Sequence, residues 1–131
     1  MDDQFHARTM PGLHEDVYAH LPNLPLAAPI LDAGCGTGAW LQRLAARGYS
    51  NLYGLERDLP AGHAIPAQCR SIDLDWDPWP WTEQNFELIT AIEVIEHLRN
   101  PGWFLREASR HMTGTSRLLI TTPNNASLYA R

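Results

Sequence analysis

The sequence predicts an α/β protein built on a doubly wound, mostly parallel sheet with about five strands. Two observations support this fold class. Short apolar segments alternate with helical segments from Ile30 onward, and the glycine-rich turn Gly34-Cys35-Gly36-Thr37-Gly38 joins the first apolar segment to a helix. Such alternation is typical of parallel sheets whose strands are connected by helical crossovers.

Length and composition limit the classes of protein that are compatible with this fold. The 131 residues fit one domain and are 44% hydrophobic, which is enough for a core of its own. The net charge of −5 argues against nonspecific electrostatic binding to nucleic acid or anionic lipid. No apolar run approaches the roughly 18 residues of a membrane span. The polar, acidic start at Met1-Asp2-Asp3 is unlike a secretory signal, and two cysteines without a C-x-x-C pattern suit a reducing compartment. We therefore expect a cytoplasmic protein.

The first half of the chain contains an arm followed by two strands. Residues 1–27 are predicted as an N-terminal arm or cap with a short helix at His14–Leu21, and residues 28–131 as the core. Within the core, Ala28–Ala33 reads as a buried strand and Asn51–Glu56 as a second one. Between them, the segment Ala39–Arg47 has helical periodicity and places Trp40, Leu41, Leu44 and Ala45 on one side.

The second half continues the alternation. The connection at 57–67 contains Pro60, Gly62 and Pro66 and leaves little room for a crossover helix. Strands are predicted at Gln68–Ile72, Phe86–Ile92 and Arg117–Thr122. Asn100 followed by Pro101 is a strong helix start, and this helix is expected to reach Met112. Its predicted buried residues are Phe104, Leu105, Ala108 and Met112.

Acidic residues occur where the predicted strands end, at Asp32, Glu56, Asp73 and Glu93. In doubly wound sheets the ligand binds outside the carboxyl ends of the strands, so these four carboxylates are expected to line one rim. Gly34, Gly36 and Gly38 allow positive φ and a close approach of ligand to backbone. The helix that follows offers free N–H groups to an anionic ligand group.

Two ligands fit the glycine turn, and charge discriminates between them. Gly34, Gly36 and Ala39 match the dinucleotide pattern G-x-G-x-x-A, and Glu56 lies where such proteins bind ribose hydroxyls. However, Asp32 would repel a diphosphate. S-adenosylmethionine carries one carboxylate for the helix start, cations for Asp32, and a ribose diol for Glu56. The rim therefore favours this cationic nucleoside, with Asp73 as acceptor for its adenine amine.

The same residues resemble those of a known family. Ile30–Gly38 looks like motif I of the class I S-adenosylmethionine-dependent methyltransferases, and Tyr53–Glu56 looks like their acidic motif on the second strand. Asn85–Ile89, Ala91–Leu98 and Leu118–Asn124 resemble three later motifs in the family's order. The resemblance is greatest to small-molecule O-methyltransferases of the type 11 or type 23 group, and it implies a Rossmann-like fold.

The chain also departs from the family's pattern. It stops after the fifth strand, whereas the family fold has two further strands that usually help to build the substrate side. The predicted strand Arg117–Thr122 would then present an apolar edge, which invites pairing with another chain. We therefore expect a fragment or a minimal variant, with a homodimer through the exposed edge as a candidate assembly.

Several side chains have both a functional and a structural interpretation. Trp76, Trp79 and Trp81 would form either an aromatic wall over adenine or a loop fixed to the sheet, and the second is preferred for two of the three. Glu93, Glu96 and His97 form a cluster that holds a divalent metal in some relatives. A further ligand expected after the fifth strand is missing here, so no metal is predicted, and Glu93 and His97 remain the candidate acid–base residues.

The sequence thus predicts methyl transfer from S-adenosylmethionine to a small-molecule acceptor. The predicted cofactor-binding residues are Asp32, Gly34, Gly36, Gly38, Glu56, Asp73, Leu74 and Ile92. Two alternatives remain open at this stage: a non-catalytic, methyltransferase-like regulatory module, and a dinucleotide-dependent oxidoreductase. The sequence does not identify the acceptor.

Overall fold

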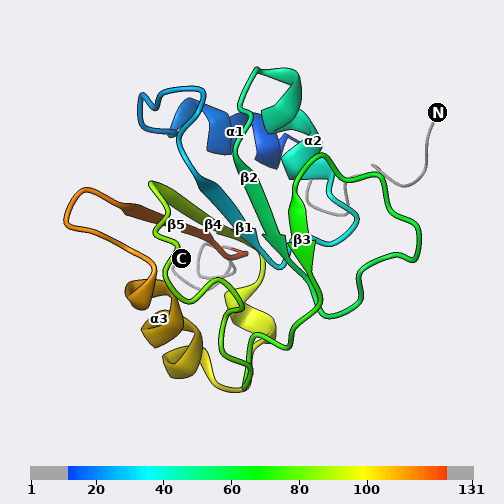
Figure 1. Ribbon diagram of the computed structural model, residues 1–131, viewed down its shortest axis with the longest axis vertical. Helices are drawn as coiled ribbons and strands as arrows, with labels where there is room; N and C mark the ends of the chain where they lie inside the picture. The colour runs from blue at the N-terminus through cyan, green and yellow to red at the C-terminus, as the bar shows by residue number, and fades with distance from the viewer. Residues whose placement is uncertain (1–11, 124–131) are drawn as a thin grey trace, which may run out of the picture.

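The computed structural model describes residues 12–123, which form one sheet with helices on both of its faces (Figure 1). The elements follow in the order α1 (Leu13–Ala19), β1 (Ile30–Ala33), α2 (Ala39–Ala46), β2 (Leu52–Leu55), β3 (Gln68–Arg70), β4 (Leu88–Ile92), the 3-10 helix η2 (Ile95–His97), α3 (Pro101–Arg110) and β5 (Arg117–Thr121).

The five strands pair in parallel in the order β3-β2-β1-β4-β5, which confirms the predicted doubly wound sheet. β1 lies at the centre, where Ile30 is in register with Leu52 of β2 on one side and with Leu88 of β4 on the other. The chain leaves β1 toward β2 and later returns to β4 on the opposite side. The carboxyl ends of β1 and β4 therefore flank the switch point where such sheets bind ligands.

Alternate side chains of the buried strands pack into two separate hydrophobic cores, one on each face of the sheet. On one face Leu31 and Ala33 pack with Phe104 and Ala108 of α3. On the other face Ile30 lies in a cluster with residues of α1 and α2, including Val17, Trp40, Leu41 and Leu44. β1, β2 and β4 are buried along their whole lengths, as expected for parallel strands covered on both sides. The described part of the predicted arm, α1, thus packs on the core.

The helix α3 begins as predicted but buries a different set of residues. Asn100 caps it by accepting a hydrogen bond from the N–H of Trp103, and Pro101 occupies its first turn. Leu105 was expected in the core, yet it is 43% exposed, so that prediction was wrong. Position 105 lies about 100° around the helix from Phe104, whereas Glu107 shares the inward side with Phe104 and is buried.

Glu107 is tolerated in the core because it has partners. Its Oε1 accepts a hydrogen bond of 2.9 Å from the N–H of Trp79, and Oε2 lies 3.2 Å from Arg110 Nη1. The carboxylate thereby ties α3 to the tryptophan-rich loop. The other differences from prediction are small: β3 ends at Arg70 rather than at Ile72, α3 ends at Arg110 rather than at Met112, and the helix η2 was not foreseen. As predicted, 57–67 contains no crossover helix.

Two further findings concern the outside of the molecule. None of the helices within 12–123 is long and apolar enough to cross a membrane. Within the same range β5 pairs with β4 alone, so it forms an edge of the described sheet, and Ile120 is partly exposed there. Assembly through this edge remains a prediction.

Candidate functional site

A cavity of about 320 Å³ lies at the carboxyl ends of β1, β2, β3 and β4. Its volume is within the range of small-molecule sites, roughly 300–1,000 Å³. The structure brings most of the predicted site residues together there. The predicted residues that line it are Gly34, Glu56, Asp73, Leu74, Ile92, Glu93 and His97. Arg57, Ile72, Asp75, Val94 and Leu98 complete the lining.

The glycine turn after β1 is held against the end of β2. The N–H groups of Gly34 and Cys35 both donate to the Leu55 carbonyl oxygen, at 2.7 and 2.9 Å. Gly34 has φ of 79°, and a Cβ there would lie 2.6 Å from Val94 Cγ2, so the turn needs glycine at this position. Of the three glycines only Gly34 lines the cavity. Gly36 and Gly38 shape the turn, and an anion site at the start of α2 remains a prediction.

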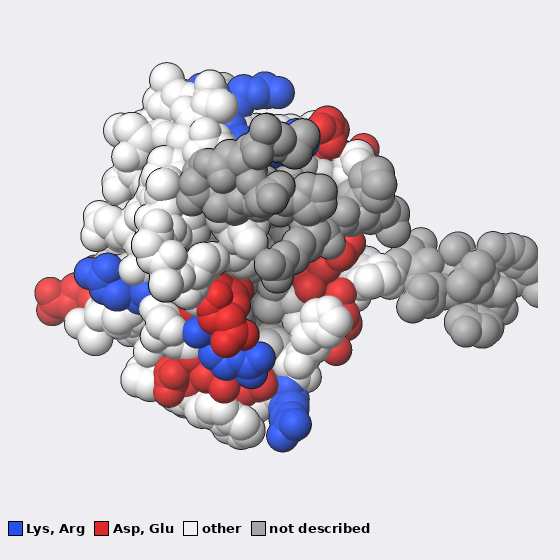
Figure 2. Space-filling view, turned by 90° about the vertical axis from the view of Figure 1, so that its right-hand side faces the viewer, with Lys and Arg blue, Asp and Glu red and all other residues white. Residues whose placement is uncertain are grey.

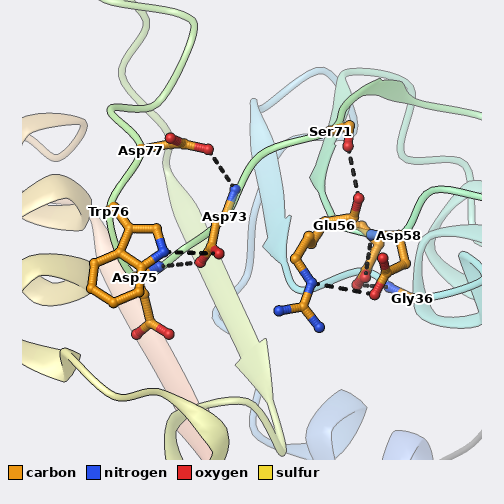
Figure 3. A network of polar contacts seen from close by, with 9 residues as sticks. Gly36, Glu56, Asp58, Ser71, Asp73, Asp75, Trp76 and Asp77 are labelled. Atoms are coloured by element: carbon orange, nitrogen blue, oxygen red, sulfur yellow. Dashed lines mark hydrogen bonds and ion pairs between the residues drawn. The ribbon is translucent and has the colours of Figure 1, made fainter.

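Glu56 links the end of β2 to this turn, as Figure 3 shows. Its Oε1 accepts a hydrogen bond of 3.0 Å from the Gly36 N–H, and its Oε2 accepts one of 3.0 Å from the Asp58 N–H. The carboxylate is thereby fixed at the cavity wall. Each carboxylate oxygen has a second acceptor position, so a diol can still bind to it.

Asp73 organises the loop that follows β3 (Figure 3). Its Oδ1 accepts from the Asp75 N–H at 2.9 Å, and its Oδ2 accepts from the Trp76 indole N–H at 3.0 Å. The loop then runs into the core, where Trp79 is 1% exposed and Trp81 packs against Tyr53 and Phe86. Two of the three tryptophans are therefore structural, as preferred above, and Trp76 is 57% exposed.

Asp32 lies inside β1 rather than on the rim, which corrects the expectation that it lines the cavity. It is 3% exposed and accepts a hydrogen bond of 2.9 Å from the Thr90 hydroxyl on β4. The difference arises because β1 continues to Ala33, so that Asp32 is enclosed by the neighbouring strands. Burial raises the pKa of this carboxyl to about 7, although the hydrogen bond from Thr90 lowers the pKa in part.

Because Asp32 is buried, we expect the stability of the folded protein to fall as pH rises. Its pKa is raised from 3.8 to about 7, so between these values the folded protein holds a proton that the unfolded chain has lost. The carboxyl therefore makes unfolding easier as pH rises, by at most about 4 kcal/mol across the window. Asp32→Asn stays neutral and keeps an oxygen for Thr90. Relative to wild type, its free energy of unfolding should rise between pH 4 and pH 7 in chemical denaturation. Parallel pH profiles for the two proteins would refute the assignment.

Glu93 and His97 form the wall that follows β4. Glu93 has φ of 54° and is the single non-glycine residue within 12–123 with positive φ. Its N–H donates to both the carbonyl and the hydroxyl oxygen of Thr121, each at 3.0 Å. Unusual backbone of this kind is concentrated at functional sites. The His97 side chain is largely exposed, and its Nε2 lies 3.9 Å from Glu96 Oε2.

Asp75 is a cavity residue that the sequence reasoning missed. Its Oδ1 accepts hydrogen bonds of 2.9 Å from the N–H groups of both Arg99 and Asn100, at the entrance to α3. Asp75 therefore connects the loop after β3 to the segment after β4, two walls of the same cavity. The available signal was the alternation of acids at Asp73, Asp75 and Asp77, which left the register of this loop uncertain.

Removal of the Asp75 carboxylate should loosen both walls. Asp75→Ala leaves two backbone N–H groups to solvent, and a loss of about 1–2 kcal/mol in the free energy of unfolding is expected for this partly exposed group. Asp75→Asn retains Oδ1 and should recover most of that loss. Thermal melts of the three proteins would test this; equal melting temperatures for alanine and wild type would show that the connection is not stabilising.

The cavity is strongly acidic. Four carboxylates line it, from Glu56, Asp73, Asp75 and Glu93, and the one arginine among the lining residues is Arg57, whose Nε lies 3.4 Å from Asp58. Figure 2 shows further Asp and Glu side chains gathered with arginines on the lower half of one face. Within the described range no group of three or more His, Cys, Asp or Glu side chains is arranged to hold a metal ion. The arrangement favours a neutral or cationic ligand with hydroxyl and amine donors.

Fold and site together define a parallel α/β domain with a nucleoside-sized cavity at the switch point of its sheet. The sequence matches the family model described as "Methyltransferase domain" over residues 6–131, and the chain belongs to this family. The predicted family resemblance is thus confirmed.

Individual relatives agree with the family assignment. A probable S-adenosylmethionine-dependent methyltransferase of Mycobacterium tuberculosis (strain ATCC 25618 / H37Rv) is 26% identical over 129 residues, covering 89% of this chain and 47% of the relative. The ubiquinone biosynthesis O-methyltransferase of Azorhizobium caulinodans is 29% identical, covering 72% and 40%. The chain therefore spans about half the length, or less, of these curated relatives.

Solved structures show the same architecture. A TehB-like S-adenosylmethionine-dependent methyltransferase from Corynebacterium glutamicum is 28% identical with a TM-score of 0.64, covering 83% of this chain and 60% of that one. The [4+2]-cyclase SpnF has a TM-score of 0.68 at 21% identity, covering 84% and 44%. Because the second protein is named for a different reaction, the fold alone does not define the chemistry.

Proposed function

We propose that this chain binds S-adenosylmethionine in the cavity at the strand ends and serves methyl transfer to a small-molecule acceptor. The observation that carries the proposal is the set of carboxylates that lines the cavity beside a glycine turn. A dinucleotide would place its negatively charged diphosphate next to these carboxylates, and the electrostatic repulsion between them would weaken binding. A nucleoside with a sulfonium and an ammonium group meets attraction instead.

The residues fit this cofactor in defined roles. Glu56 is fixed at the end of β2, where its free acceptor positions suit the ribose diol. Asp73 and Leu74 provide a carboxylate and an apolar side chain for adenine, and Ile92 lines the same cavity from β4. Gly34 permits the ligand to approach the backbone closely. Asp32 is not among the residues that line the cavity, and its carboxyl accepts a hydrogen bond from Thr90 instead.

The expected chemistry requires mostly alignment from the protein. S-adenosylmethionine supplies a methyl group on a sulfonium, which already contains a good leaving group. The chain contributes by holding the nucleoside at a fixed depth and by leaving room beside the wall of Glu93 and His97 for an acceptor. For a hydroxyl acceptor, Glu93 and His97 are the candidates to take its proton, and this role is supported by their position in the cavity lining.

The names of relatives support the choice of reaction. Two of them are a probable S-adenosylmethionine-dependent methyltransferase and a ubiquinone biosynthesis O-methyltransferase, and the second suggests phenolic acceptors. The alternative of a non-catalytic module predicts cofactor binding without turnover.

Turnover tests the proposal directly. The chain is incubated with methyl-labelled S-adenosylmethionine and a panel of phenols, and transfer is followed as label in the extracted product. His97→Ala and Glu93→Gln are compared with Glu83→Ala, a variant of an exposed acid outside the cavity lining. Label transfer that depends on His97 or Glu93 supports the enzyme. Tight binding of the cofactor with no transfer to any acceptor would favour the regulatory module.

Cofactor binding is expected to need no divalent metal. The wall after β4 provides Glu93, Glu96 and His97, but their described neighbours do not complete a metal site. A chelator should therefore leave the affinity for S-adenosylhomocysteine unchanged in calorimetry. An affinity that falls with chelator and is restored by magnesium would show that the cluster binds metal.

A further inference from the structure

The two cysteines of the chain lie together although they are far apart in the sequence. Cys35 belongs to the glycine turn after β1, and Cys69 is the middle residue of β3. Between them runs β2, whose Gly54 is in register with Cys69. A Cβ built on Gly54 would lie 3.0 Å from the Sγ atoms of both cysteines. The two sulfurs therefore lie no more than about 6 Å apart, beside the one position of β2 that has no side chain.

The two thiols differ in exposure and in acidity. Cys35 is buried, whereas Cys69 is half-buried. The neighbouring Cys35 thiol lowers the pKa of Cys69, whereas the Cys69 thiol, together with burial, raises the pKa of Cys35. The thiolate is the reactive form of cysteine. Cys69 is thus both the more accessible and the more nucleophilic of the pair, and Cys35 is placed to react with it in a second step.

We propose that Cys35 and Cys69 form a reversible disulfide when the protein meets a hydroperoxide, and that this bond weakens binding at the glycine turn. In the first step the Cys69 thiolate attacks one oxygen of hydrogen peroxide; the O–O bond breaks, and the hydroxide released takes up a proton to give water. Cys69 is then a sulfenic acid. Its sulfur is attacked by Cys35; the S–S bond forms, the S–O bond breaks, and the leaving hydroxide departs as water with the Cys35 proton.

The new bond would act on residues of the cavity. An S–S bond is about 2.05 Å long, so its formation draws Cys35 toward β3. The Cys35 N–H donates to the Leu55 carbonyl oxygen and its own carbonyl oxygen accepts from the Gly38 N–H, each at 2.9 Å. On either side of Cys35, Gly34 lines the cavity and Gly36 donates to Glu56. A displaced Cys35 therefore moves the turn relative to Glu56.

The first part of this inference is independent of the ligand, and the second part rests on the proposed function. Coupling between two sites is typically about 5- to 150-fold in affinity and is reciprocal. Oxidation should therefore weaken the binding of S-adenosylhomocysteine within this range, and saturating S-adenosylhomocysteine should shift the thiol–disulfide equilibrium toward the reduced form by the same factor.

The experiment uses the full chain treated with hydrogen peroxide and analysed by mass spectrometry before and after reduction. The expected product is a monomer that has lost two hydrogen atoms, has no thiol left for alkylation and yields a linked Cys35–Cys69 peptide. Cys69→Ser is the matched control, since it keeps the size of a half-buried side chain. A product in which Cys69 carries added oxygen while Cys35 can still be alkylated would overturn the proposal, as would a disulfide between two chains.

Calorimetry with S-adenosylhomocysteine then tests the consequence for binding. Wild type should bind more weakly after oxidation and recover on reduction, while Cys69→Ser should be unaffected by peroxide. A linked peptide with unchanged affinity would overturn the second part of the proposal. If the reduced protein binds no S-adenosylhomocysteine, the proposed function fails, whereas the mapped disulfide still decides the first part.

Discussion

Replacement of Glu56 by alanine is expected to weaken the binding of S-adenosylhomocysteine roughly ten- to a hundredfold. Losing hydrogen bonds to a charged group costs on the order of 1.5–3 kcal/mol, which corresponds to this range. In this protein the carboxylate also holds Gly36 and Asp58, so its removal frees the turn as well as the ribose acceptor. The dissociation constant measured by calorimetry is the direct readout.

Two further variants separate the roles of Glu56. Glu56→Gln keeps one oxygen acceptor and the shape of the side chain but loses the charge, so its affinity should lie between those of wild type and Glu56→Ala. Glu83→Ala removes an exposed acid elsewhere and should bind like wild type. Unchanged affinity in Glu56→Ala would exclude Glu56 from the binding site.

Gly34→Ala is expected to cause a large loss of stability. The residue has φ of 79°, which costs an alanine about 1–2 kcal/mol. The added Cβ would also lie 2.6 Å from Val94 Cγ2, and forcing such overpacking typically costs about 1–3 kcal/mol. The free energy of unfolding should therefore fall by roughly 2–5 kcal/mol in chemical denaturation.

Gly62→Ala provides the matched control for Gly34. Gly62 has φ of 66°, but nothing lies within 4 Å of a Cβ built there. Gly62→Ala should lose stability only through the unfavourable backbone conformation, without a steric clash. The difference in free energy of unfolding between the two variants therefore measures the clash with Val94. Equal losses in both would mean that the segment after β4 moves away at no cost, and that Val94 does not fix the turn.

Much of the fold was predictable because the relevant signals are local. The glycine turn, the Asn100-Pro101 helix start and the buried apolar strands each follow from backbone preferences or short-range periodicity. The parallel sheet then follows from the alternation of elements. Most of the predicted site residues lie together for the same reason: strand ends meet at one edge of a parallel sheet.

The predictions that failed depended on the neighbours of a residue in space. An aspartate at position 32 is the residue type expected on the rim, yet it is buried and hydrogen-bonded to Thr90 of β4. No sequence pattern around either residue predicts this hydrogen bond. Leu105 is exposed and Glu107 buried because Trp79, distant in sequence, offers its N–H to a carboxylate at that point. Asp75 was missed since its partners, Arg99 and Asn100, come from the other side of the cavity.

The acidic cavity is expected to bind a nucleoside that carries an ammonium group and not a dinucleotide. The decisive measurement is isothermal titration of the reduced chain with S-adenosylhomocysteine and, separately, with NADH. Both ligands contain an adenosine, which continues into an amino acid with an ammonium group in the first and into a diphosphate in the second. We expect saturable binding of one S-adenosylhomocysteine per chain, weakened roughly ten- to a hundredfold in Glu56→Ala, and no heat of binding with NADH. Saturable binding of NADH together with no binding of S-adenosylhomocysteine would contradict it.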